Sequence, residues 1–124
     1  MARILIAEDE EPLRTLIKRA LAEEGHFVVA TADGSEALDA LQSEGDGFDL
    51  LLTDIKMPVM DGIALALAVA RDFPKLPILL MTGYADQRER VSGLEALICD
   101  VISKPFALAE IKFAVASALA KGKR

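Results

Sequence analysis

Five short apolar runs alternate with stretches of helical periodicity along this sequence. The runs cover residues 3–7, 27–31, 48–53, 77–81 and 98–102. Each run is almost continuously hydrophobic, which is typical of parallel strands that are covered by helices on both faces. Because the runs alternate with helix-like stretches, the pattern predicts an α/β fold with a doubly wound parallel sheet of five strands.

Five helices are expected between and after these strands. The first shows apolar residues at helical spacing, Asp33 can cap the second, and Asp61 opens the third. The fourth, over residues 85–97, is expected to be short and mobile because its sequence is highly charged and contains a glycine. The last covers residues 108–120 and has an apolar face formed by Leu108, Ile111, Val115 and Leu119.

Length and composition favour a single domain. The chain has 124 residues, 52% of them hydrophobic, which suits one core over residues 1–124 with no output domain. The longest apolar run, residues 63–70, is too short to span a bilayer, and the first residues lack a secretory pattern. The single cysteine, Cys99, excludes an intrachain disulfide and fits a reducing compartment. We therefore expect a cytoplasmic protein without a membrane segment.

The charge of the chain argues against nucleic acid as a partner. Asp and Glu outnumber Lys and Arg by 20 to 14, which gives a net charge of −6. The only basic cluster is at the end of the chain and consists of Lys121, Lys123 and Arg124. Because nucleic-acid binding favours a basic patch, no such binding is expected.

Polar side chains capable of chemistry follow four of the predicted strands. Ligands of an open parallel sheet bind beyond the carboxyl ends of its strands, so these side chains are expected to share one crevice. They are Glu8 and Asp9 after the first strand, Asp54 after the third, Thr82 after the fourth and Lys104 after the fifth.

These residues favour a particular pair of ligands. Three carboxylates that face one lysine repel each other unless a further cation is present. A small set of oxygen ligands suits Mg²⁺, which completes its coordination with water and phosphate oxygens. A phosphoryl group is in turn stabilised by Mg²⁺, a lysine and a hydroxyl. The residues predict a site for Mg²⁺ and phosphate, and they leave the nucleophile open.

Each of these residues also has a purely structural interpretation. An acid directly after a strand often caps the next helix, which applies to Asp9 and more strongly to Glu10. Thr82 can be a helix cap, and Lys104 can be a surface lysine. Asp54 is harder to explain in this way because it follows a strongly apolar run, where an unpaired acid is rare.

Taken together, the residues resemble the receiver domain of bacterial two-component response regulators, which has the fold of the chemotaxis regulator CheY. The resemblance extends over residues 3–120. It rests on five motifs, which are Glu8-Asp9, Asp54, Met57-Pro58 with Asp61-Gly62, Thr82, and Lys104-Pro105-Phe106. It implies a flavodoxin-like sheet with strand order 2-1-3-4-5.

The resemblance implies roles for the residues around the phosphate. Asp54 is expected to be the phosphoacceptor, Thr82 the switch hydroxyl that moves to the phosphoryl group, and Lys104 its charge partner. The Lys104–Pro105 peptide bond is expected to be cis, which would aim the lysine into the crevice.

The resemblance also implies a set of Mg²⁺ ligands. Asp9 is expected to bind the metal directly, together with Asp54 and the backbone carbonyl of Lys56. Glu8 is expected to support the metal through a water molecule.

The sequence departs from the family pattern at two positions. Glu8 stands where an aspartate is usual, and Val101 stands where an aromatic switch residue is common. Coupled rotation of Thr82 and an aromatic ring is therefore not expected in its usual form. Lys56 and Tyr84 occupy positions at which the family varies the lifetime of the phosphoryl group, and the direction of their effect is open.

The implied function is that of a phosphoacceptor response regulator in a two-component system or phosphorelay. Such a protein is not an enzyme beyond its own phosphoryl transfer and autodephosphorylation. Its donor would be a histidine kinase or a histidine phosphotransferase, because His26 has no acidic partner at suggestive spacing and is interpreted as structural. Its signal would pass to a downstream target protein, for which Phe113 is a candidate contact or simply an isolated exposed residue. A monomer or weak dimer is expected.

Alternatives from other classes remain. Short segments around Thr82 and Lys104, with Val101, resemble the CpdR-like subgroup, whose members act as adaptors for regulated proteolysis. A pseudo-receiver would bind partners without phosphorylation. A Mg²⁺-dependent aspartyl phosphatase usually needs a second acid two residues after its nucleophile, where this chain has Lys56.

Overall fold

A computed structural model describes residues 1–44, 47–83 and 90–122 of the chain. Five parallel strands form one sheet in the order β2-β1-β3-β4-β5, as predicted. The strands are β1 (Arg3–Ala7), β2 (Phe27–Thr31), β3 (Leu50–Asp54), β4 (Ile78–Thr82) and β5 (Asp100–Ser103). The carboxyl ends of all five therefore meet at one edge of the sheet.

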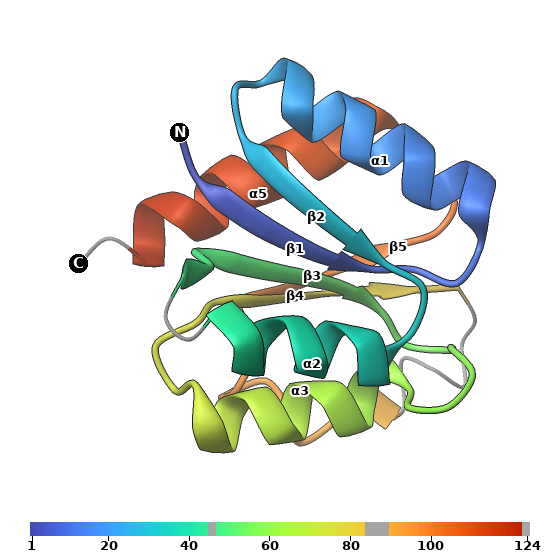
Figure 1. Cartoon of the computed structure of the whole chain (residues 1–124). Coiled ribbons are helices and arrows are strands. Elements are labelled where there is room, and N and C mark those ends of the chain that lie inside the picture. The colour runs from blue at the N-terminus through green and yellow to red at the C-terminus, as the bar shows by residue number, and fades with distance from the viewer. Residues whose placement is uncertain (45–46, 84–89, 123–124) are drawn as a thin grey trace.

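Helices cover both faces of this sheet. They are α1 (Glu11–Glu23), α2 (Gly34–Glu44), α3 (Gly62–Asp72) and α5 (Leu108–Gly122). Figure 1 shows α1 and α5 on one face and α2 and α3 on the other. This is the doubly wound arrangement that the alternation of strands and helices predicts.

The described part of the chain contains four helices, one fewer than the five that the sequence predicts. Of the expected helix over residues 85–97, residues 85–89 lie outside the described residues, as does Tyr84. Within the remainder, only residues 90–91 are helical, and turns follow them. Gly93 has φ +92°, a left-handed conformation that a right-handed helix does not include, so no further helical turn forms there.

Backbone pairing extends β3, β4 and β5 one residue beyond their predicted ends. Asp54 pairs with Met81, and Thr82 pairs with Ser103, so both polar residues belong to strands. Both side chains are buried. The predicted third strand ended at Thr53, and the predicted fourth strand ended at Met81. The ladder of backbone hydrogen bonds continues one residue further in each strand, to Asp54 and Thr82.

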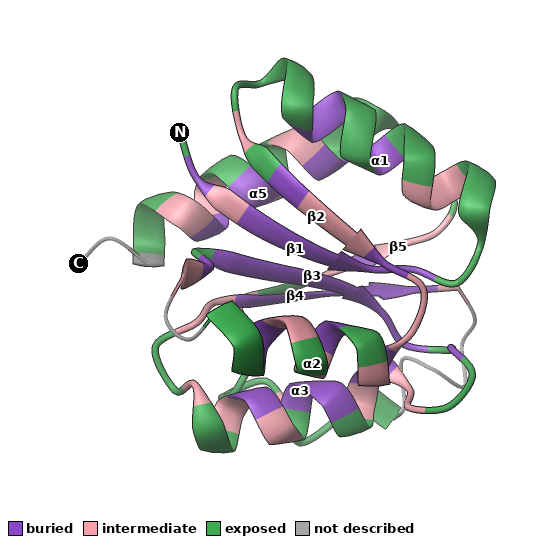
Figure 2. Cartoon of the chain, viewed as in Figure 1, coloured by how far each residue is buried: buried purple, intermediate pink, exposed green. Residues whose placement is uncertain are grey.

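The core consists of two layers that the sheet separates. Ile4 and Ile6 of β1 face α1 and α5, while Leu5 and Ala7 face α2 and α3. This alternation follows from the two-residue repeat of a strand. Figure 2 shows the central strands β1, β3 and β4 as almost entirely buried. Three of the loops that carry polar residues thus start from the most rigidly packed part of the fold.

Candidate functional site

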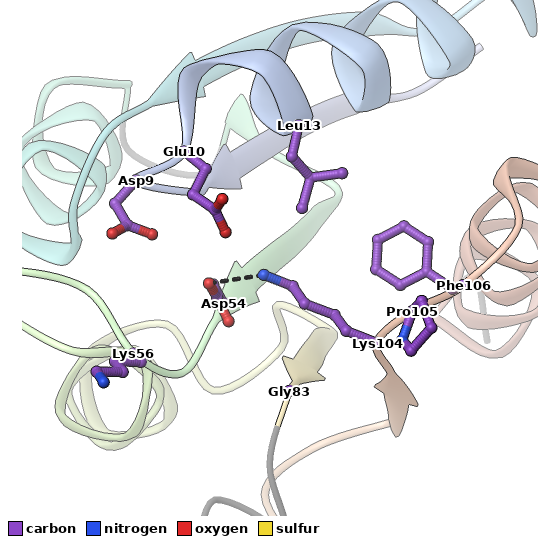
Figure 3. A pocket seen from close by; sticks show the side chains of 9 residues that line it. All are labelled: Asp9, Glu10, Leu13, Asp54, Lys56, Gly83, Lys104, Pro105 and Phe106. Atoms are coloured by element: carbon purple, nitrogen blue, oxygen red, sulfur yellow. Dashed lines mark hydrogen bonds and ion pairs between the residues drawn. The ribbon is translucent and has the colours of Figure 1, made fainter.

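A pocket of about 520 Å³ opens at the carboxyl edge of the sheet. Its polar lining consists of Asp9, Glu10, Asp54, Lys56 and Lys104. These residues come from the ends of β1, β3 and β5, as Figure 3 shows. Of the five side chains that the sequence predicts to share one crevice, Asp9, Asp54 and Lys104 line this pocket, whereas Glu8 and Thr82 are buried and do not line it.

Asp54 is the last residue of β3, and only 7% of its side chain is exposed. Its Oδ1 accepts a hydrogen bond of 2.8 Å from the backbone N–H of Ile55. Its Oδ2 lies 2.9 Å from Nζ of Lys104, the contact drawn as a dashed line in Figure 3. The buried carboxylate is therefore oriented by two donors on different sides.

Lys104 follows β5 and extends across the edge of the sheet to reach two carboxylates. Besides the contact with Asp54, its Nζ lies 3.0 Å from Oε1 of Glu8. Burial alone would lower the pKa of Lys104, but the hydrogen bonds and charges of Asp54 and Glu8 outweigh it and raise the pKa above 10.5. Lys104 is thus firmly cationic. The Lys104–Pro105 peptide bond is cis, as predicted.

Glu8 has the most strongly altered acidity in the pocket region. Its side chain is completely buried, and burial raises its pKa from 4.5 to about 7. The hydrogen bond from the backbone N–H of Glu10 works against this rise, the charge of Asp54 adds to it, and Lys104 opposes it. Perturbed acids of this kind, close to a pocket, are typical of functional sites.

The donor set of the site fits a divalent cation. Among the described residues, Glu8, Asp9 and Asp54 bring carboxylate oxygens within 4.8 Å of one another. Asp9 is exposed, in contrast to the two buried acids, and it faces the pocket. Three carboxylates against one ammonium leave an excess of negative charge, and an all-oxygen set suits Mg²⁺. Lys56 is exposed at the rim of the same pocket.

Thr82 ends β4 next to Asp54 and is 1% exposed. Its Oγ1 is buried and has no hydrogen-bond partner in the part of the chain that the structure describes. A buried hydroxyl without a partner costs stability, so its presence needs an explanation. Val101, on β5, is partly buried and packs on the α2–α3 side of the core.

The loop after β3 has an unusual conformation. The backbone N–H of Met60 donates to the carbonyl of Pro58 at 2.7 Å, and Val59 between them has φ +66°. This is a γ-turn with a β-branched residue at positive φ, a conformation that is rare and strained. The side chain of Val59 is thereby left exposed.

Two features of the site were missed in the sequence. The first is an apolar wall of the pocket, formed by Leu13, Pro105 and Phe106. Leu13 lies in the first turn of α1. A helix that begins directly after a strand places its first turn beside the crevice, so the sequence could have indicated that Leu13 lines the pocket. The second is the contact between Glu8 and Lys104, which are 96 residues apart and show no local pattern.

Comparisons with known proteins agree with the fold. The family model of the response regulator receiver domain matches residues 4–116. The chain is 36% identical over 109 residues to the transcriptional regulatory protein TcrA of Mycobacterium tuberculosis and 38% identical to the response regulator MprA of Mycobacterium avium. Each match covers 88% of this chain but only 42% and 47% of the relatives, so the chain spans less than half of their length.

A solved structure is similar over nearly the whole chain. The response regulator protein TrrA of Thermotoga maritima, in complex with Mg²⁺-BeF, has 31% identity and a TM-score of 0.84. The match covers 95% of this chain and 99% of that one.

None of the helices in the described part of this chain has the length and apolar content of a membrane span. The family model, the relatives and the fold lead to the same conclusion: the chain belongs to the response regulator receiver domain family.

Proposed function

We propose that Asp54 accepts a phosphoryl group in a Mg²⁺-dependent reaction and that this modification switches a protein-binding surface. The observation that carries the proposal is the position of the Asp54 carboxylate. It ends a central buried strand, lies at a pocket, contacts Lys104 at 2.9 Å and has Glu8 and Asp9 beside it. A carboxylate in such a setting is a suitable nucleophile towards phosphorus.

The transfer reaction follows from the chemistry of these groups. An oxygen of Asp54 attacks the phosphorus of a phosphohistidine or of acetyl phosphate. An O–P bond forms as the P–N bond to the imidazole, or the P–O bond to acetate, breaks, and the leaving group keeps the electron pair. Lys104 stabilises the charge on the phosphoryl oxygens because its ammonium already lies at Asp54.

The residues that would hold Mg²⁺ are the carboxylates of Asp9 and Asp54 and the backbone carbonyl of Lys56, with Glu8 nearby. Bound there, the metal supplies positive charge for the phosphoryl oxygens. The related TrrA was solved in complex with Mg²⁺-BeF, which supports the assignment of a metal to this kind of site.

The hydroxyl of Thr82 is the group we assign to the switch. It is buried beside Asp54 and lacks a partner among the described residues, so it is available to bind a phosphoryl oxygen. Movement of Thr82 towards the phosphoryl group would shift the end of β4. Because Val101 is aliphatic, this movement does not require the rotation of an aromatic ring at that position.

The phosphodonor is proposed to be a histidine kinase or a histidine phosphotransferase. The apolar wall of Leu13, Pro105 and Phe106 gives such a partner a surface beside the nucleophile. His26 does not serve as an internal donor, because its Nδ1 accepts a hydrogen bond of 3.2 Å from Ala2, at the opposite end of β1 from Asp54.

A downstream protein is proposed to bind at α5. Phe113 is 75% exposed, as predicted from its position on the helix, and it lines a groove of about 530 Å³ between β5 and α5. The role of Phe113 as a partner contact, and an adaptor role in proteolysis, stay predictions. The phosphatase alternative is disfavoured because Lys56 occupies the place of the required second acid.

The intact mass of the protein after incubation with acetyl phosphate and Mg²⁺ tests the proposal. We expect the wild type to gain one phosphoryl group, and we expect no gain with EDTA or in Asp54→Asn. An unmodified wild type, also after incubation with a phosphorylated histidine phosphotransferase, would favour the pseudo-receiver instead.

A further inference from the structure

Arg14, near the start of α1, makes a contact back to the loop that precedes the helix. Its Nη1 donates a hydrogen bond of 2.9 Å to the backbone carbonyl of Glu8. Side chains of an α-helix tilt towards its N-terminus, which gives a long side chain at this position the reach to that loop. Only 19% of the Arg14 side chain is exposed, although arginine is rarely buried without a partner. The guanidinium is therefore part of the loop structure between β1 and α1.

The helix itself does not account for the position of this guanidinium. A positive charge near the N-terminus of a helix is disfavoured by the helix dipole. The contact of Arg14 with Oε2 of Glu11 is long, at 3.8 Å, and 83% of the Glu11 side chain is exposed. Such an exposed ion pair contributes little to stability. The carbonyl of Glu8 is thus the partner that accounts for the partial burial of Arg14.

The carbonyl that Arg14 binds belongs to the peptide bond between Glu8 and Asp9. A peptide bond is planar, so a fixed carbonyl oxygen also limits the orientation of the N–H and Cα of Asp9. On the other side of Asp9, the backbone N–H of Glu10 donates to Oε2 of Glu8 at 3.0 Å. The backbone N–H of Glu8 donates to the carbonyl of Thr31, also at 3.0 Å. The backbone is therefore held on both sides of Asp9.

Asp9 is the exposed acid of the carboxylate cluster, and it lines the pocket from this held loop. Figure 3 shows its carboxylate directed into the pocket. Arg14 itself does not line the pocket, to which α1 contributes Leu13 instead. Arg14 can therefore act on a bound ligand through the loop or through its charge. For a cation, these two effects have opposite signs.

We propose that Arg14 is a positioning residue that orients the peptide between Glu8 and Asp9, and with it the Asp9 carboxylate, for binding a divalent cation. The inference rests on the proposed Mg²⁺-dependent phosphorylation of Asp54. Groups that hold a metal ligand in place commonly affect metal affinity although they do not touch the metal. Arg14 is such a group for the one exposed acid of the cluster.

The sign of the change in Mg²⁺ affinity separates positioning from charge. Arg14→Met removes the guanidinium and keeps an unbranched side chain that suits a helix. If Arg14 acted only through its charge, the variant would bind a cation more tightly, because like charges repel. If Arg14 positions Asp9, the dissociation constant of Mg²⁺ should rise by about tenfold. A Mg²⁺ titration followed by the backbone amide NMR signals measures this constant without a phosphodonor.

Two variants on the same helix are the matched controls. Arg19→Met removes an exposed positive charge, and Glu11→Gln removes the ion-pair partner of Arg14. Both leave the hydrogen bond to Glu8 in place, so both should bind Mg²⁺ within about twofold of the wild type. Arg14→Lys keeps the charge and a donor, so it should recover part of the affinity. An affinity of Arg14→Met that equals or exceeds that of the wild type would overturn the inference.

The metal-free protein gives a second readout. The chemical shift of the Glu8 carbonyl carbon depends on the hydrogen bond that its oxygen accepts. We expect this signal to move in Arg14→Met and to stay in place in Arg19→Met. Should Arg14→Met not fold, Arg14→Gln, whose polar side chain is too short for the contact, takes its place with the same expected changes. An unchanged Glu8 signal would contradict the inference.

Phosphorylation by acetyl phosphate tests whether the effect reaches the reaction. Because Asp9 is positioned for metal binding, Arg14→Met should raise the Mg²⁺ concentration at half-maximal rate by about tenfold. Saturating Mg²⁺ should bring the rate to within about twofold of the wild type. A lower rate that excess Mg²⁺ does not restore would indicate general damage to the site and overturn the inference. If the wild type itself binds no Mg²⁺ or is not phosphorylated, the proposed function fails, which is a different result from these.

Discussion

Gly62 is packed directly against the backbone carbonyl of Asp54. A Cβ atom at residue 62 would lie 2.0 Å from the carbonyl oxygen of Asp54 and 2.8 Å from its carbonyl carbon. The N–H of Gly62 also donates to the carbonyl of Ile55 at 2.7 Å. The start of α3 is thus fixed to the end of β3, and only glycine allows the approach. This explains the glycine that follows Asp61 in the sequence motif.

Gly62→Ala is expected to reduce both stability and phosphorylation. The new Cβ meets backbone atoms, which cannot rotate away, so the loop after Asp54 must shift. We expect the free energy of unfolding in urea to fall by about 1–3 kcal/mol. Gly47→Ala is the control, since the nearest atom to its Cβ is at 3.4 Å, and its effect should be small. Equal stability of the two variants would show that the loop adapts freely.

Asp61 is expected to stabilise the start of α3 through two separate contacts. Its Oδ1 accepts from the backbone N–H of Ala64 at 2.9 Å, and its Oδ2 lies 2.5 Å from a guanidinium nitrogen of Arg90. Asn retains the cap but not the ion pair, whereas Ala loses both. In urea unfolding, Asp61→Ala should cost about 1 kcal/mol for the cap. Asp61→Asn should cost less, because a partly exposed ion pair contributes about 1 kcal/mol at most.

The contribution of Asp61 should depend on pH in a defined direction. Burial would raise the pKa of Asp61, but the hydrogen bond from Ala64 and the contact with Arg90 outweigh it and hold the pKa below 3.8. A lowered pKa in the folded state stabilises the fold above pH 3.8, and this stabilisation is lost as the pH falls through the folded-state pKa. The difference in unfolding free energy between the wild type and Asp61→Asn should therefore disappear in acid. A difference that grows in acid would contradict this assignment.

Thr82→Val is expected to stabilise the unphosphorylated protein. The variant replaces a buried hydroxyl that has no partner among the described residues by a methyl group of similar shape. Urea unfolding should show a gain of about 1 kcal/mol. Thr31→Val is the matched control, because Oγ1 of Thr31 donates to the carbonyl of Ile6 at 2.7 Å and is also buried. This control should lose about 1 kcal/mol.

The same variant separates phosphorylation from switching. Thr82→Val keeps Asp54 and Lys104, so it should still accept a phosphoryl group. Its NMR spectrum should change less on phosphorylation than that of the wild type, because the hydroxyl that is assigned to the phosphoryl oxygen is absent. A full spectral change in Thr82→Val would remove Thr82 from the switch.

The elements of the fold could be predicted where local pattern decides them. The predicted and observed bounds of β1 and β2 are identical, at residues 3–7 and 27–31, because both strands are almost continuous apolar runs. The ends of β3 and β4 depend on pairing with neighbouring strands, so Asp54 and Thr82 were placed one residue outside them. The turns after Val91 depend on the backbone conformation of Gly93, which the helical pattern did not reveal.

The candidate site was predictable in its composition but not in its contacts. Asp54, Asp9 and Lys104 stand at strand ends, and the topology of a parallel sheet alone brings them to one edge. The burial of Glu8 and its contact with Lys104 depend on the reach of two long side chains from different strands. Such contacts arise only in the folded chain, which is why the sequence did not reveal the contact between Glu8 and Lys104.

Chemical localisation of the phosphoryl group tests the central claim most directly. Borohydride reduces an aspartyl phosphate to homoserine, so the modified residue can be identified by peptide sequencing in a mass spectrometer. After reaction with acetyl phosphate and Mg²⁺, we predict homoserine at position 54 of the wild type and at no position of Asp54→Asn. Homoserine at Asp9 or another acid, or a phosphoryl group that is retained in Asp54→Asn, would contradict the assignment of Asp54 as the phosphoacceptor.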